Sequence, residues 1–394
     1  MRAARPTSLF DAQPYADLPD EVLQTVLAKT AEVADAVRGL FSRVDERRDA
    51  MRDMLLSSGR IRRTDALPFV AAPPVAAIDG GAAIEKSIGT DTALAVAVGI
   101  EGLTDAPIGH WTGVQYAAWQ KTLPHEGDDT ARTCRGAMTA LELSVARCAP
   151  HDVVLLDGSH LTPVIALNSM LSVGNEALRH EIAEVVTRHE TADALAEVMA
   201  SPRCVAVVKY DSSRDLSHTW LPPDVRGPGL GLDDRTTMTL LLQEGEFTDP
   251  QPVALTQQSK SNWLAKRIEV LTPSDAAREA VRESLNEAIN QVRDDRLLVT
   301  YFKPHAWAPA FRLEIKPEVA AAPALLSAAL AAIRAQVVSP EIREPYPQWV
   351  ADRMAKSVGD ALIALRTAVN FDLADDGLAE YASLMAHSYR TEAM

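Results

Sequence analysis

Cysteine is scarce in this chain: Cys134, Cys148 and Cys204 are the only three among 394 residues. Their spacing matches no zinc-binding pattern, and an odd number cannot pair completely. A zinc-ribbon protein and a small secreted fold held by disulfides are therefore both excluded. We expect three reduced thiols packed in the interior.

A long apolar run is also missing. Residues 1–14 mix arginines with polar residues and do not resemble a signal peptide, and no other stretch reaches membrane-spanning length. We therefore expect a soluble, cytoplasmic protein with no membrane partner. With 47% hydrophobic and 24% charged residues, the composition is that of a globular protein.

An excess of positive charge is a third absence, since the formal net charge is −15. Non-specific affinity for DNA comes mostly from Lys and Arg neutralising phosphates, so this composition argues against a protein that binds DNA unaided. If DNA is the substrate, bound cations, a locally basic channel or a partner protein must compensate.

Several common catalytic motifs are absent as well. The glycines of GPGLG at 227–231 have no strand directly before them, no helix opening after them and no following Lys-Ser or Lys-Thr. They fit neither a dinucleotide-binding motif nor a P-loop, and we interpret them as part of a loop. The chain also contains no nucleophile elbow and no HExxH pair.

Two segments that are present share one pattern: VAAIDGG at 75–81 and VVLLDGS at 153–159 are apolar runs ending at Asp-Gly. Each predicts a buried strand that ends in a sharp turn, which places Asp79 and Asp157 at strand ends. In an open α/β fold, ligands bind at neighbouring strand ends. Two adjacent carboxylates repel unless a cation joins them, so we predict a Mn²⁺ or Mg²⁺ site.

A third acidic residue lies on an apolar helix face. The helix predicted from about 130 to 148 carries a stripe of Cys134, Met138, Leu141 and Val145, and Glu142 points with this stripe. A buried glutamate is costly unless it is paired or bound to a cation, so Glu142 is a candidate ligand. Such a trio suits phosphodiester hydrolysis with two cations held roughly 4 Å apart.

Two further candidates each have a plainer alternative. Lys209 ends the strand predicted at 204–210, where it either contacts a scissile phosphate or extends a solvated tip from an apolar stem. Asp352 lies early in a helix opened by Tyr346. It is either a fourth ligand or the ion-pair partner of Lys356.

Three basic or imidazole side chains also have two interpretations. Arg132 and Arg135 either contact phosphates or are solvated surface charges. His160 either touches a metal ion or makes a structural hydrogen bond.

The remaining pattern predicts an α/β chain. Residues 19–58 form one long amphipathic helix, which packs either on its own domain or in a dimer or partner seam. Further strands are predicted at 93–100, 237–242, 297–302 and 311–315, and further helices at 175–200, 274–292 with Ser274 as its cap, 322–338 and 347–369.

An ordered set of short motifs resembles the NurA family of nucleases, from about residue 72 to about residue 360. The motifs are IDGG (78–81), MTALELS around Glu142, LLDGS (155–159), VVKYDSS (207–213), LLQEGE (241–246), FRLEI (311–315) and EPYPQWVAD (344–352). One departure is His160, which follows DGS where the family usually has an apolar residue.

The resemblance implies a ribonuclease H-like fold, in which a mixed five-stranded sheet is flanked by helices. It implies that Asp79, Glu142 and Asp157 are the principal Mn²⁺ ligands, with Asp352 as an additional one and Lys209 near the phosphate. We expect Arg132, Arg135 and Tyr346 as further DNA contacts.

The resemblance also implies an activity and partners. NurA proteins are dimers that degrade single- and double-stranded DNA, commonly as 5′–3′ exonucleases with single-strand endonuclease activity. They work with HerA, a hexameric ring ATPase that translocates DNA, in end resection or phage defence. Such a motor would also feed DNA to an acidic chain.

The expected organisation is an N-terminal helical arm (1–66), a nuclease domain (67–369) with insertions near 175–200 and 220–235, and a helical tail (370–394). Two alternatives remain open at this point. One is an actin-like ATP-binding phosphotransferase, since that fold also uses Asp-Gly turns around phosphate. The other is a non-catalytic scaffold that docks a DNA motor through the N-terminal helix.

Overall fold

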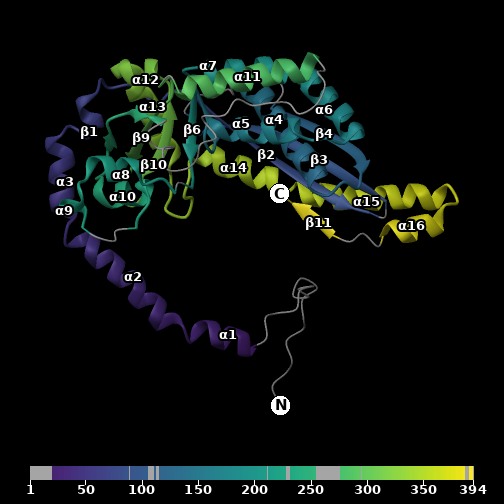
Figure 1. The fold of residues 1–394 in the computed structure, drawn as a ribbon, viewed down its shortest axis with the longest axis horizontal. Coiled ribbons are helices and arrows are strands. Elements are labelled where there is room, and N and C mark those ends of the chain that lie inside the picture. The colour runs from purple at the N-terminus through teal and green to yellow at the C-terminus, as the bar shows by residue number, and fades with distance from the viewer. Residues whose placement is uncertain are drawn as a thin grey trace.

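One mixed sheet of 11 strands runs through the molecule (Figure 1). The computed structural model describes residues 20–87, 89–104, 111, 115–210, 212–227, 231–253, 276–293, 295–386 and 390–393. The strand order is β1-β7-β9-β10-β6-β5-β2-β3-β4, with β8 beside β9 and β11 beside β2. The predicted α/β class with a mixed sheet is confirmed, and the sheet is wider than the five strands that the family resemblance implies.

The strands are β1 (Ile61–Arg63), β2 (Val75–Lys86), β3 (Thr90–Glu101), β4 (Tyr116–Pro124), β5 (Val153–Asp157), β6 (Cys204–Val208), β7 (Glu246–Thr248), β8 (Gln251–Pro252), β9 (Leu298–Lys303), β10 (Phe311–Ile315) and β11 (Arg390–Ala393). A short 3₁₀ turn, Thr64–Ala66, follows β1. Only β5 is parallel to its neighbours, β2 and β6, and the other pairings are antiparallel.

Strand β2 is longer than the sequence predicts. Its first four residues pair with β5, up to Ile78 opposite Leu156, but the strand continues through Asp79 to Lys86. The extra length pairs with β3 and with β11. Asp79 is therefore inside a strand, and the prediction of a turn at Gly80 is wrong, because antiparallel pairing on the other side keeps β2 extended.

Five helices cover one face of the sheet: α4 (Asp128–Cys148), α5 (Leu161–Leu171), α6 (Glu176–Arg188), α7 (Thr191–Ala200) and α11 (Ala276–Arg293) (Figure 1). Ile78 and Ala82 of β2 are buried there with Leu141 of α4. The helix predicted at 175–200 is divided into α6 and α7 because Glu190 has a left-handed backbone, with φ of 45°. The predicted cap Ser274 lies outside the described residues.

The opposite face is covered by α12 (Pro317–Ala321), α13 (Pro323–Gln336), α14 (Tyr346–Lys356) and α15 (Val358–Asp375), and α16 (Ala379–Ala386) folds back on α15. Helix α14 crosses β2 and β3, which brings a late segment of the chain against an early one. The helix predicted at 347–369 is thus two helices, which meet at Ser357.

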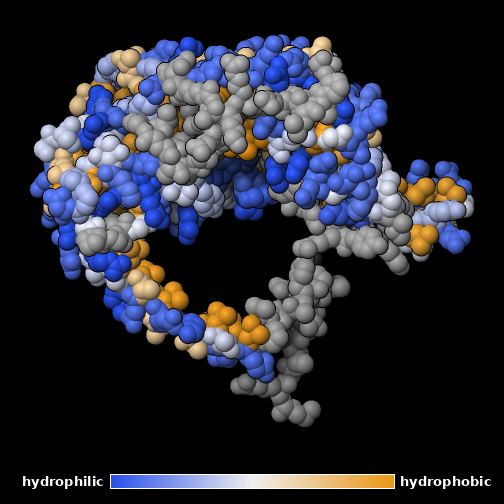
Figure 2. Space-filling view, in the orientation of Figure 1, coloured by the Kyte–Doolittle hydropathy of each residue, from blue (hydrophilic) through white to orange (hydrophobic). Residues whose placement is uncertain are grey.

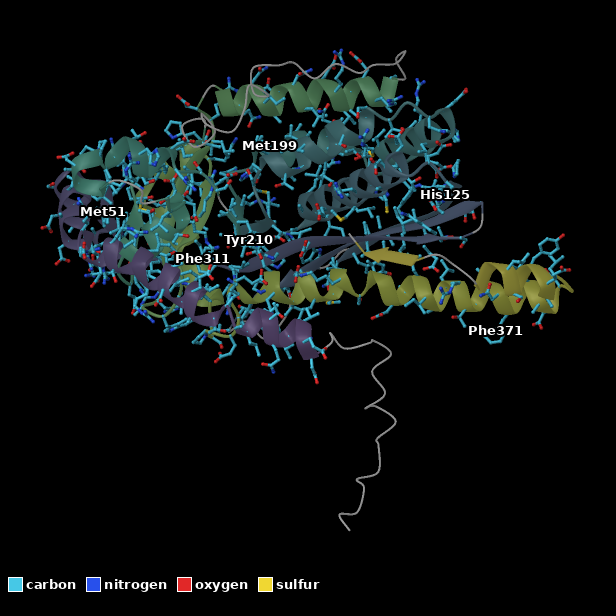
Figure 3. All side chains as sticks on the ribbon, turned by 60° about the horizontal axis from the view of Figure 1, so that its bottom comes forward. Met51, His125, Met199, Tyr210, Phe311 and Phe371 are labelled. Atoms are coloured by element: carbon cyan, nitrogen blue, oxygen red, sulfur yellow. The ribbon has the colours of Figure 1, made fainter. Side chains whose placement is uncertain are left out.

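A smaller cluster lies at the β1–β7–β9 end of the sheet, formed by α3 (Arg48–Ser57), α8 (Asp215–Trp220), α9 (Pro223–Arg226) and α10 (Asp234–Leu241). Met51 is fully buried there (Figure 3). The strand predicted at 237–242 is in fact α10. Asp233 caps that helix by accepting the Thr236 N–H at 2.7 Å, and this local bond outweighs the β-branched composition.

One cysteine and the N-terminal helices depart from the predictions. Cys134 and Cys204 are buried as predicted, but Cys148 is exposed at the last turn of α4. Residues 20–57 are helical as predicted, but they form three helices, α1 (Asp20–Leu27), α2 (Thr30–Asp45) and α3, where one long helix was expected. Helices α1 and α2 extend away from the body and carry an apolar stripe (Figure 2).

That stripe and the far end of α15 both expose large apolar side chains. The stripe consists of Val22, Leu23, Val26, Leu27, Val33, Val37 and Phe41. Phe371 on α15 is 69% exposed (Figure 3). Among the described helices, not one combines the length and the apolar character needed to cross a membrane.

Candidate metal centre

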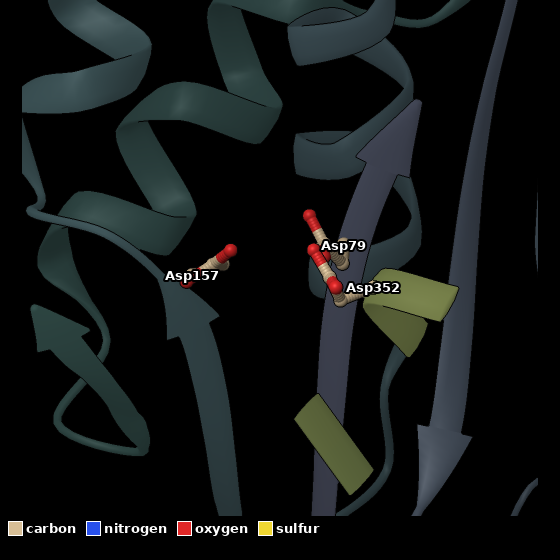
Figure 4. Close-up of side chains that lie close together, drawn as sticks. All are labelled: Asp79, Asp157 and Asp352. Atoms are coloured by element: carbon tan, nitrogen blue, oxygen red, sulfur yellow. The ribbon is translucent and has the colours of Figure 1, made fainter. Parts of the chain in front are cut away.

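Three aspartates from distant parts of the chain meet at the centre of the sheet. Asp79 comes from β2, Asp157 from the end of β5 and Asp352 from α14, and one carboxylate oxygen of each lies within 4.8 Å of the others (Figure 4). Asp79 is buried and the other two are half-buried. This is the only such cluster of potential ligands found among the described residues.

Strand register explains how the first two aspartates come together. Ile78 lies opposite Leu156 in the parallel β2–β5 pair, so Asp79 and Asp157 follow at the same level. Strand β5 ends there because Gly158 turns the chain with φ of 82°. The predicted strand-end position is therefore correct for Asp157.

The surroundings of Asp79 favour its protonated form. Burial, followed by the nearby charge of Asp157, raises the pKa of Asp79 to about 7. A cation bound between the carboxylates would favour the ionised form of Asp79 instead. Three oxygen donors at this spacing fit Mn²⁺ or Mg²⁺, which prefer hard oxygen ligands.

Glu142 approaches from the other face of the sheet. It belongs to α4 and lines a cavity of about 40 Å³ together with Leu156, Asp157 and Ser159. Burial, with the charges of Asp79 and Asp157, raises the pKa of Glu142 to about 8. Its oxygens are outside the set of three mutually close carboxylates, so it adjoins the cluster without being part of it.

The two glycines after Asp79 let both helices reach β2. A Cβ added to Gly80 would collide with the side chains of Glu142 and Met138, and one added to Gly81 would collide with the backbone carbonyl of Ala355 in α14. Side chains alternate between the faces of a strand, so the glycines open one face to α4 and the other to α14. Both glycines let a helix approach β2 closely, and neither forms a turn.

Two lysines bind the cluster carboxylates. Lys209 Nζ is 3.1 Å from Asp157 Oδ2 and 2.6 Å from Glu344 Oε2. Burial opposes the charge of Lys209, but Asp157 and Glu344 together raise its pKa. Lys356 Nζ is 2.7 Å from Asp352 Oδ2, so the ion pair considered as the plain alternative for Asp352 exists alongside its place in the cluster.

The other predicted contacts lie away from the carboxylates. Arg132 and Arg135 are exposed on α4, ten and seven residues before Glu142, which is about 15 and 10 Å along the helix axis. Arg132 is 3.4 Å from Asp129. Tyr346 is the first residue of α14, with its ring centroid 6.3 Å from that of Trp349.

His160 has a structural position. Its side chain is fully buried, with Nδ1 3.6 Å from Glu314 Oε2, and it is not in the acidic cluster. Sequence reasoning missed Glu344, which holds Lys209, although it opens the EPYPQWVAD motif. It also missed Ser159 and Glu314, whose pairing depends on strand register that no local pattern indicates.

Comparison with known proteins gives a match of fold. No protein-family model and no curated protein matches the sequence. The crystal structure of the NurA nuclease from Sulfolobus solfataricus superposes with a TM-score of 0.54 and 13% identity, covering 91% of this chain and 98% of that one. The chain therefore has the fold of this NurA structure, as the sequence resemblance predicts.

Two further NurA crystal structures superpose less well. One contains manganese and matches with a TM-score of 0.47 at 11% identity, over 86% of this chain and 98% of that one. The other is bound to dAMP and manganese and matches with a TM-score of 0.46 at 9% identity, over 84% and 93%.

Proposed function

We propose that this chain, which has the fold of a NurA nuclease, is a divalent-cation-dependent nuclease that hydrolyses DNA phosphodiester bonds. The observation that carries the proposal is the meeting of Asp79, Asp157 and Asp352, which lie far apart in the sequence. A cluster of this kind is costly without a counter-charge, and it lies where an α/β fold binds ligands. The same cluster argues against a non-catalytic scaffold.

The residues have separate tasks in this proposal. The three aspartates hold Mn²⁺ or Mg²⁺, two ions in all, with Glu142 as a fourth ligand from the opposite face. When bound, such ions stabilise the charge that develops on the phosphate and favour ionisation of the attacking water. Lys209, held by Glu344, places its ammonium beside Asp157, where it can neutralise a phosphate oxygen.

The finer assignments rest on the family resemblance. They are 5′–3′ exonuclease activity with single-strand endonuclease activity, a homodimer, and action with a HerA-like hexameric ATPase in end resection or phage defence. The net charge of −15 supports a partner that delivers DNA, because the chain attracts phosphates weakly. Arg132, Arg135 and Tyr346 are proposed DNA contacts outside the acidic cluster.

The experiment compares cleavage of end-labelled DNA by the wild-type chain and by Asp157→Asn, with Mn²⁺ and with chelator. We expect chelator to abolish cleavage and Asp157→Asn to lower it roughly a hundredfold or more, because a ligand carboxylate is lost. Asp65→Asn, at an exposed aspartate near the other end of the sheet, is the matched control and should cleave normally. Full activity in chelator would refute the proposal.

A further inference from the structure

A fully buried carboxylate lies beneath the turn that carries Asp157. Glu314 is in β10, and only β6 separates β10 from β5. The register places Glu314 beside Ala206, and Ala206 beside Leu156 at the end of β5. Because Ala206 has only a methyl side chain, the Glu314 carboxylate can extend across it to the turn.

Glu314 accepts hydrogen bonds from two residues of that turn. The Ser159 hydroxyl donates to its two oxygens at 3.0 and 2.9 Å, and the His160 backbone N–H donates at 2.9 Å. The guanidinium of Arg312 donates to it at 2.9 Å. Ser159 and His160 follow Asp157 by two and three residues, so the chain is tied down directly after the metal-site aspartate.

The Ser159 hydroxyl also joins the turn to the next helix. Its oxygen accepts the Leu161 N–H at 3.1 Å, at the first residue of α5. Glu314 thus supplies negative charge at the N-terminus of α5, where the helix dipole favours it. Burial opposes ionisation, but the contacts with His160 and Arg312 lower the pKa of Glu314 to about 2.

We propose that Glu314 and Ser159 are positioning residues that set the affinity of the acidic cluster for divalent cations. This inference rests on the proposed function and deepens it. Gly158 turns the chain with a left-handed backbone directly after Asp157, a conformation that does not by itself fix the turn. Without the bonds to Glu314, the Asp157 carboxylate is held by Lys209 and by strand pairing alone, and a cation must order the turn as it binds.

The test measures binding of Mn²⁺ by titration calorimetry, with Ser159→Ala as the principal variant and Glu314→Gln as the second. We expect Ser159→Ala to weaken binding roughly tenfold, as is usual when a group supporting a metal ligand is lost. Ser159→Thr keeps the hydroxyl and should restore most of the affinity. If Glu314→Gln does not fold, the two serine variants still decide the question.

Ser327→Ala is the matched control. Ser327 is a buried serine of α13 whose hydroxyl donates to the Pro68 carbonyl at 2.7 Å, so this variant loses a comparable bond elsewhere. It should bind Mn²⁺ like the wild type. Equal affinity in Ser159→Ala and the wild type would overturn the positioning role alone, whereas a wild type that binds no Mn²⁺ would overturn the proposed function as well.

Discussion

At the scale of single residues, Asp79 shows how the proposed function and stability oppose each other. Its carboxyl group is buried beside Asp157, and its pKa is about 7 where 3.8 is normal. The folded, cation-free protein therefore holds a proton that the unfolded chain releases near pH 4. Between these two pH values the folded state binds more protons, so the free energy of unfolding falls as pH rises.

Replacing this carboxylate should stabilise the cation-free protein. In Asp79→Asn the amide keeps the shape and its oxygen can still accept the Gly80 N–H, which Asp79 accepts at 2.8 Å. We expect urea unfolding at pH 8 in chelator to give a free energy roughly 2–4 kcal/mol above wild type, corresponding to the shift in pKa. The gain should disappear near pH 4.

The control for this prediction is again Asp65→Asn. Arg63 lowers the pKa of Asp65, so the amide should bring no gain in stability at pH 8. The prediction is contradicted if the free energy of unfolding of the wild type is the same at pH 4 and pH 8 and equals that of Asp79→Asn.

Sequence reasoning located individual residues well where a local pattern was available. The Asp-Gly pairs indicated Asp79 and Asp157, and helical spacing indicated the inward side of Glu142. Glu314 could not be found in this way, because its partners come from strand register across β6.

At the scale of elements, β2 is held between two helices that need its glycines. The sequence predicted a turn at Gly80, because the pattern of a single strand does not reveal its partners. In the structure, β3 and β11 continue the pairing beyond Gly80. Helix α10 was missed because its threonine- and leucine-rich sequence favours a strand, whereas Asp233 caps a helix there by accepting the N–H and the hydroxyl of Thr236. The local sequence indicates that a strand or helix exists. It indicates less reliably how far neighbouring strands extend it.

The two glycine positions should respond differently to alanine. Gly81→Ala meets the backbone of Ala355, which cannot rotate away, so α14 must shift and the protein should lose roughly 1–3 kcal/mol of stability. Gly80→Ala meets side chains of Glu142 and Met138, which can move. That variant should melt near the wild-type temperature but bind Mn²⁺ more weakly.

Gly359→Ala is the matched control, because nothing lies within 4 Å of a Cβ at this position in α15. It should be as stable as wild type or slightly more stable, since alanine favours a helix. Thermal melts of the three variants, with Mn²⁺ titrations, check the order. A Gly81→Ala protein as stable as Gly359→Ala would show that α14 does not depend on this contact.

At the scale of the whole molecule, the N-terminal helices divide into an anchored and an exposed part. Helix α3 is bound to the body, with Met51 and Leu55 buried and Arg52 2.6 Å from Glu246. The apolar stripe of α1 and α2 is exposed. This arrangement suits the proposed homodimer, in which a second chain covers the stripe.

Removing residues 1–36 should therefore separate assembly from catalysis. The cut keeps α3 and the buried Val44, so the body should retain its melting temperature. We expect light scattering to show a loss of dimer while Mn²⁺ binding stays within twofold of the full chain. The paired substitution Val26→Ser and Val33→Ser tests the same stripe without truncation, and a dimer that survives both changes would exclude this seam.

The two lysines at the acidic cluster make cation uptake an exchange of ions. If the proposed cation binds, it competes with ammonium groups that already compensate Asp157 and Asp352. The two lysines differ in their surroundings. Lys356 is 74% exposed and pairs with Asp352, whereas Lys209 also forms an ion pair with Glu344. In the proposed metal centre we therefore expect a cation to displace Lys356 from Asp352 more readily than it displaces Lys209 from Asp157.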